Sequence, residues 1–121
     1  MAAPNLVNVA TITAKSVQAT LDTTLTTEIL ANASSSGKVF KVNAIIVANI
    51  DGSSAADVSV AITKSGGSPI MIASTISVPA DATLVVIDKN SSIYLEEGDN
   101  IEAGASANSD LTITISYEEL S

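Results

Sequence analysis

The residues best suited to chemistry form one acidic cluster in the last third of the chain. Glu96, Glu97, Asp99 and Glu102 lie within seven residues of one another, with Asn100 among them. Carboxylate and amide oxygens are the ligands that Ca²⁺ prefers, and a turn can gather several of them around one cation. The regular spacing of a calcium loop is absent, and acidic residues also mark solvent-exposed turns. We therefore expect a solvated turn with no bound metal, and these four acids are the candidate ligands if a cation does bind there.

Other catalytic patterns are incomplete. Serine and lysine stand close together at Ser36 with Lys38 and at Lys64 with Ser65. A catalytic lysine needs burial, whereas these lie in glycine-flanked loops. A pair of carboxylates for glycoside hydrolysis requires a fixed separation, which no pattern here sets. The sequence predicts no catalytic residue and no cofactor.

The amino-acid composition argues against two classes of binding partner, nucleic acids and membranes. The 121 residues include no Cys, His, Arg or Trp, and 13 acidic residues against 5 lysines give a net charge of −8. Such a chain is repelled by nucleic acid and by anionic membrane surfaces. No stretch approaches the ~20 apolar residues that span a bilayer. We expect no nucleic-acid and no membrane partner.

Residues that favour strands dominate the chain. Val, Ile and Thr together supply 37 of the 121 residues, and branching at Cβ favours the pleated backbone over a helix. Strand-like runs recur every 8 to 15 residues between turn clusters. This spacing predicts an all-β protein, a single-domain antiparallel β-sandwich of about eight or nine strands with a jelly-roll-like arrangement. Residues 1–16 would form an extended N-terminal arm or first strand, and residues 17–121 the sandwich.

The individual strands follow from the alternation of apolar and polar residues. One or two strands are expected in the first 36 residues, and the later ones are predicted at 39–50, 58–63, 70–78, 84–87, 93–95, 101–105 and 111–118. In the last strand, Leu111, Ile113, Ile115 and Tyr117 should face the core. In the run 39–50 every even position is apolar, which places these residues in the core: Phe40, Val42, Ala44, Ile46, Ala48 and Ile50.

That parity leaves Ile45 and Val47 on the outer face, where large aliphatic side chains need cover. A neighbouring subunit, the N-terminal segment or a loop could cover them, and the opposite parity would remove the problem. The N-terminal residues could also add a strand to the edge of a neighbour. The predicted protein-contact residues are therefore Val7, Val9, Ile12, Ile45 and Val47.

Four segments of the second half carry a family resemblance. They are residues 42–53 (VNAIIVANIDGS), 77–84 (SVPADATL), 93–101 (IYLEEGDNI) and 110–119 (DLTITISYEE). Together they resemble small all-β virion structural proteins of tailed bacteriophages, including cyanophages. The resemblance covers roughly residues 37–121, and VPADATL and YLEEGDNI are its most specific parts.

The resemblance implies a non-enzymatic virion component assembled in the host cytoplasm, where a chain without cysteine loses nothing. The first expectation is a capsid decoration (cement) protein, which binds the major capsid protein and forms a homotrimer or other homo-oligomer. A neck, tail or fibre-associated subunit bound to another virion protein is the alternative in the same class. A calcium-assisted carbohydrate-binding module is the alternative of another class, although three aromatic residues supply few sugar platforms.

Overall fold

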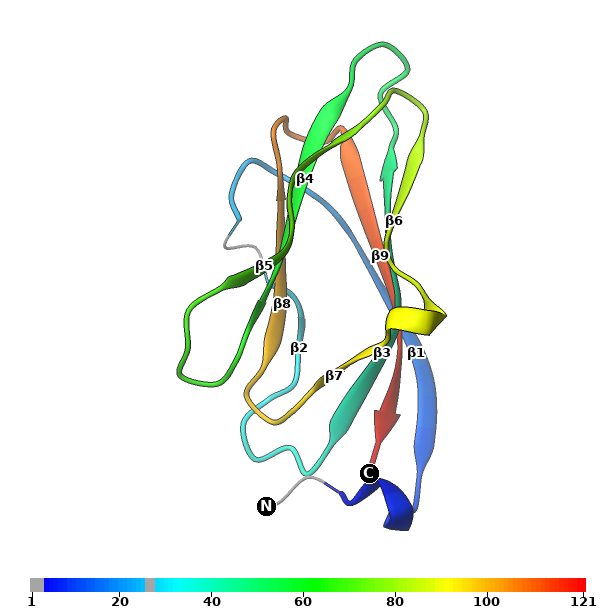
Figure 1. Cartoon of the computed structure of the whole chain (residues 1–121), viewed down its shortest axis with the longest axis vertical. Helices are drawn as coiled ribbons and strands as arrows, with labels where there is room; N and C mark the ends of the chain where they lie inside the picture. The colour runs from blue at the N-terminus through cyan, green and yellow to red at the C-terminus, as the bar shows by residue number, and fades with distance from the viewer. Residues whose placement is uncertain (1–3, 26–27) are drawn as a thin grey trace.

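The computed structural model describes residues 4–25 and 28–121, which form two antiparallel β-sheets packed face to face (Figure 1). Two short 3₁₀ turns, η1 and η2, accompany nine strands in this part of the chain. The elements in chain order are η1 (Leu6–Asn8), β1 (Ile12–Thr20), β2 (Glu28–Ala31), β3 (Val39–Asn49), β4 (Ala56–Thr63), β5 (Ile70–Val78), β6 (Thr83–Ile87), η2 (Lys89–Ser91), β7 (Ile93–Leu95), β8 (Asn100–Ala105) and β9 (Leu111–Leu120).

The strand order is that of a jelly roll. One sheet runs β1-β9-β3-β6, with β7 also paired to β3, and the other runs β2-β8-β4-β5. Counting inward from the two ends of the chain, β1 pairs with β9, β2 with β8, β3 with β6 and β7, and β4 with β5. The chain is thus one long antiparallel hairpin rolled into two sheets. The predicted all-β sandwich of eight or nine strands is confirmed, including two strands in the first 36 residues.

Alternating apolar side chains fill the space between the sheets. The prediction for the last strand is confirmed, because Leu111, Ile113, Ile115 and Tyr117 are all buried. Tyr117 packs against Phe40 with ring centroids 5.2 Å apart. With so few aromatics, the rest of the core consists of Val, Ile, Leu and Ala.

The predicted parity of β3 is wrong beyond Val42. Val42 pairs with Tyr117 and Ala44 with Ser116, so Asn43 is an extra residue opposite β9. Such a β-bulge reverses which side of the sheet the following residues face. Ile45 and Val47 are therefore fully buried, whereas Ile46 is 37% exposed on the outer face.

The N-terminal segment joins the sandwich before residue 16. Strand β1 begins at Ile12 and crosses the expected boundary between arm and domain. Just before it, the backbone N–H groups of Ala10 and Thr11 donate to the carbonyl oxygen of Ser121, at 2.8 and 2.9 Å. The segment just before β1 and the C-terminal residue accordingly lie together at one end of the sandwich (Figure 1). Within 4–25 and 28–121, no helix is long and apolar enough to cross a membrane.

Candidate interaction surfaces and the acidic turn

The acidic cluster builds a tight turn between β7 and β8. The N–H of Asp99 donates to the carbonyl oxygen of Glu96 at 3.0 Å, and Gly98 adopts a φ of +87°. A Cβ at Gly98 would lie 2.6 Å from the Oγ of Ser65 in the β4–β5 hairpin. Glycine is therefore required for both the backbone conformation and the contact between the two turns.

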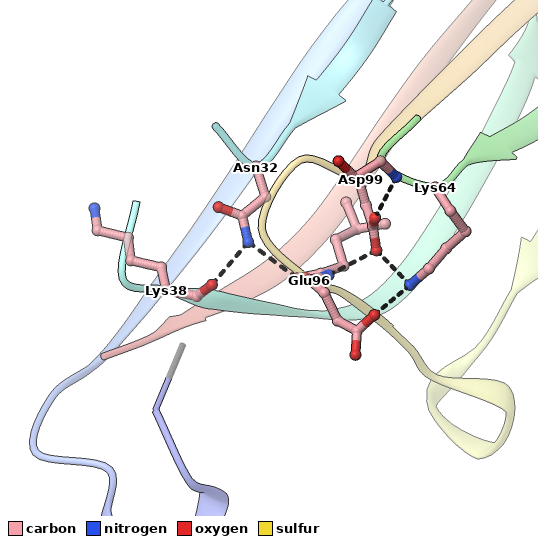
Figure 2. A network of polar contacts seen from close by, with 7 residues as sticks. Asn32, Lys38, Lys64, Glu96 and Asp99 are labelled. Carbon is pink, nitrogen blue, oxygen red and sulfur yellow. Dashed lines mark hydrogen bonds and ion pairs between the residues drawn. The ribbon is translucent and has the colours of Figure 1, made fainter. Parts of the chain in front are cut away.

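The carboxylate of Asp99 is the buried centre of this turn, with its side chain only 2% exposed. It accepts hydrogen bonds from Lys64 Nζ at 2.5 Å, from the N–H of Glu96 at 2.9 Å and from the N–H of Ser65 at 3.0 Å (Figure 2). Burial by itself raises the pKa of Asp99, but these hydrogen bonds outweigh it and lower the pKa below 3.8. The bonds to Asp99 and Glu96 raise the pKa of Lys64 above 10.5.

The structure does not bring the four candidate metal ligands together. Glu96 binds Lys64 Nζ at 2.6 Å, and Glu97 accepts from the N–H of Gly37 at 3.0 Å. Glu102 points to another partner, the hydroxyl of Thr63, at 2.6 Å. Among the residues described, no three acidic side chains converge on a point where a cation would bind. The cluster instead ties together the β2–β3 loop, the β4–β5 hairpin and the β7–β8 turn.

Buried Asn32 completes this arrangement, which we call the Asp99 clasp (Asn32, Lys64, Ser65, Glu96 and Asp99). Its Nδ2 donates to the carbonyl oxygens of Lys38 at 2.8 Å and Leu95 at 3.1 Å (Figure 2). Its backbone N–H donates to the carbonyl oxygen of Asp99 at 2.9 Å. The role of Asn32 could not be predicted from the sequence, because one asparagine between two alanines carries no periodic signal.

A second buried asparagine ties the β3–β4 turn to the far end of β5. Asn49 Nδ2 donates to the carbonyl oxygens of Ser54 at 3.0 Å and Val78 at 2.9 Å, and its Oδ1 accepts from the N–H of Asp51 at 2.8 Å. Asp51 in turn accepts from the N–H of Ser53 at 3.0 Å, which is the local turn that an Asp-Gly-Ser sequence favours. The two ends of the β4–β5 hairpin are thus fixed by separate polar networks.

A shallow groove of about 600 Å³ crosses the outer face of the five-stranded sheet. Small side chains, including Ala14, Ala44 and Ser116, line it, and η2 projects from the sheet beside it (Figure 1). Its acidic groups already have partners, because Asp88 caps η2 and Glu118 accepts from Asn43 at 3.0 Å. The groove therefore presents a surface for contact rather than a set of converging reactive groups.

The predicted contact residues fall into two groups. Val7 and Ile12 are 88% and 61% exposed, and Val9 is partly exposed, so all three are open to a partner. Ile45 and Val47 are wrong as contact candidates, because the bulge at Asn43 turns both into the core.

Larger apolar surface lies where the sequence analysis named no contact. On β5, four large side chains are at least 37% exposed: Ile70, Met71, Ile72 and Ile76. On the outer face of the other sheet, Ile46 pairs with Val85, which is 55% exposed. The alternation of residues 70–78 identifies a strand but not its place at the edge of a sheet. The signal in the sequence is instead that residues 65–80 carry no charge.

Comparison of the chain with protein-family models, curated proteins and solved structures yields no match.

Proposed function

We propose that this chain is a non-enzymatic structural subunit of a bacteriophage virion, and that it works as a capsid decoration protein. One observation supports a role in assembly: exposed large apolar side chains occur on three separate parts of one small acidic domain. They lie in the N-terminal segment (Leu6, Val7, Ile12), along β5 (Ile70, Met71, Ile72, Ile76) and on the outer face of the other sheet (Ile46, Val85). Apolar patches of this kind mark contacts with other proteins.

Separate patches suit a subunit that touches more than one neighbour at once. A cement protein at a joint between shell subunits binds through several contacts, each of which can be weak because all are made together. The resemblance of residues 37–121 to virion proteins gives the biological setting, with the major capsid protein as partner and a homo-oligomer as the assembled form. The Asp99 clasp and the Asn49 network support this use for the β5 patch, since they fix the two ends of the β4–β5 hairpin that carries it.

The direct test is the copy number of this chain in purified phage particles, measured by quantitative mass spectrometry. Hundreds of copies per particle are expected for a decoration protein. Tens of copies or fewer would place the chain in the neck, tail or fibre instead. Absence from purified particles would overturn the proposal of a virion protein altogether.

A carbohydrate-binding role is the alternative of a different class. It depends on Ca²⁺ at the acidic turn, where Lys64 and two backbone N–H groups already occupy the carboxylate of Asp99. A glycan array with Ca²⁺ present, read beside the copy number, tests this alternative. A specific glycan signal that is lost on chelation would favour it over the structural role.

A further inference from the structure

The two described sheets have four strand edges without a paired neighbour. Three of these edges have features that disfavour pairing with another chain. Strand β1 carries Lys15, and β2, in the part of it that the structure describes, has four residues and contains Glu28. The edge formed by β6 and β7 consists of strands of five and three residues, with η2 between them. Short edge strands and charged side chains are the usual devices that prevent edge-to-edge association.

The fourth edge, β5, is nine residues long and has neither device. Its two fully core-facing residues are Ala73 and Val78, and every other residue from 64 to 77 is exposed. The exposed fractions of Ile70, Met71, Ile72 and Ile76 are 66%, 44%, 37% and 40%. The hairpin that carries them stands at the outer side of the four-stranded sheet (Figure 1).

Charge identifies the partner that this edge suits. Residues 65–80 form the longest uncharged run in a chain of net charge −8. Two copies of so acidic a protein repel each other across most of their surfaces. At β5 they meet without placing carboxylates against one another. A strongly basic or acidic partner, by contrast, finds no opposite charge within this run.

The irregular backbone of β5 limits how far such an association extends. Relative to β4, strand β5 has one extra residue between Met71 and Ala73, and another between Ala73 and Ile76. Bulges interrupt the regular ladder and increase the local twist. The edge therefore favours packing of its side chains over the long, flat pairing that propagates into fibrils.

We propose that two copies of this chain associate through their β5 edges about a two-fold axis. Each copy uses the same patch, so the contact closes at two copies. The 14 residues from 64 to 77, of which 13 are exposed, are fewer than the ~20–30 per partner of a standard interface. The dimer is accordingly expected to be weak in solution. This inference concerns the isolated chain and holds whether or not the chain belongs to a virion.

The first test is sedimentation equilibrium of the full chain from about 5 µM to 1 mM, at low and high salt. We expect a reversible dimer that tightens as salt screens the net charge. The variant Ile70→Lys should weaken the dimer at least tenfold, although it makes the chain less acidic. Tyr94→Lys, with the same change of charge at a residue 45% exposed on β7 of the other sheet and outside the three apolar patches, should leave it unchanged. Thermal melts of both variants check that they fold.

The second test uses the absence of cysteine from the chain. A two-fold axis at the middle of β5 brings Ser74 of one copy near Ser74 of the other, within reach of a disulfide. Ser74→Cys should therefore form a disulfide-linked dimer under mild oxidation. Ser16→Cys, at the middle of β1, is the matched control, because both residues are exposed and central in nine-residue edge strands.

Three outcomes would overturn the proposal. The chain could remain monomeric to 1 mM, or Ser74→Cys could cross-link no faster than Ser16→Cys. The dimer could also survive Ile70→Lys but disappear when residues 1–10 are deleted, which would assign the contact to the N-terminal segment. A virion copy number of zero would leave this dimer intact, so the two proposals fail separately.

Discussion

Strands β1 and β5 occupy comparable places, yet they present opposite surfaces. Each is a nine-residue edge strand, one in each sheet. Strand β1 pairs with β9 over nine consecutive residues without interruption and carries Lys15, which binds Glu119 at 3.3 Å. Strand β5 carries two bulges, no charge and four exposed large apolar side chains.

The difference shows that lying at the edge of a sheet does not determine whether a strand is protected against association with another chain. A regular strand such as β1 is protected by its side chains, whereas β5 is irregular in its backbone and apolar in its side chains. Because β5 contributes little to the core, its place depends on the polar networks at the two ends of its hairpin. Four substitutions test this contrast.

Asn49→Ala should have the largest effect, because Asn49 binds the carbonyl oxygen of Val78 at the end of β5. The change removes one buried bond, to Val78, and two partly buried bonds, to the carbonyl oxygen of Ser54 and from the N–H of Asp51, which costs about 3 kcal/mol in total. For a domain of this size, a decrease in Tm of about 12 °C is expected by calorimetry.

Asn43→Ala is the matched control on the same strand. Asn43 makes a single bond to Glu118 at 3.0 Å in a partly exposed position, so its loss should cost less than about 1 kcal/mol. Equal losses for the two variants would show that the Asn49 network has no special role.

Asp99→Asn should come second, with a loss of about 2 kcal/mol, because it removes the charge from the buried end of the Asp99 clasp. The pKa of Asp99 is lower in the folded chain than in the unfolded one. Its stabilising contribution is therefore complete above the ordinary value of 3.8 and is lost as the pH falls through the folded value.

The measurement is the urea unfolding free energy of the wild type and the variant between pH 2 and 7. Asp99→Asn should flatten the acid limb of this profile. Asp88→Asn, at the exposed cap of η2, makes the same change of charge, and asparagine is also a good cap. If Asp88→Asn flattens the profile equally, Asp99 is not the group responsible. For Lys64, whose pKa is raised, stability should be lost as the pH rises through the folded value.

Thr75→Gly should stabilise the protein slightly, by about 0.5 kcal/mol. Thr75 has a φ of +53° in the bulge of β5, a conformation that costs a β-branched residue about 1–2 kcal/mol, and the flexibility of glycine cancels part of the gain. Thr13→Gly in regular β1 should instead destabilise by about 1 kcal/mol. Denaturant melts of both variants test the comparison, and effects of the same sign would contradict it.

Lys15→Val should change stability least, by no more than about 0.5 kcal/mol, because the lysine is 46% exposed and Glu119 keeps Lys38 as a partner at 3.2 Å. It should nevertheless increase self-association in sedimentation experiments, since it removes the only charge on the β1 edge. If the variant self-associates no more than the wild type, Lys15 does not protect this edge from association.

The alternation of apolar and polar residues predicted where the strands lie. It predicted poorly which face of a strand is buried and which distant residues contact it. The alternation in residues 111–118 identified both the strand and its buried face, because β9 lies in the middle of its sheet. The same method failed for residues 39–50, since the bulge at Asn43 reverses the pattern and the run after it, residues 44–48, is apolar at every position and fits either face. The acidic cluster was visible as well. Its ion pair with Lys64 could not be predicted, because Lys64 is more than 30 residues away and nothing in the sequence links the two.

The sequence by itself determined the class of this protein: a cysteine-free, acidic chain of alternating β-branched residues forms antiparallel sheets, because the period of two is a property of each strand alone. Only the tertiary structure decided which strands became edges, where Asn43 reverses β3, and that Asp99 binds a lysine. Those features depend on which distant segments come into contact, and no local run of residues determines the free energy of those contacts.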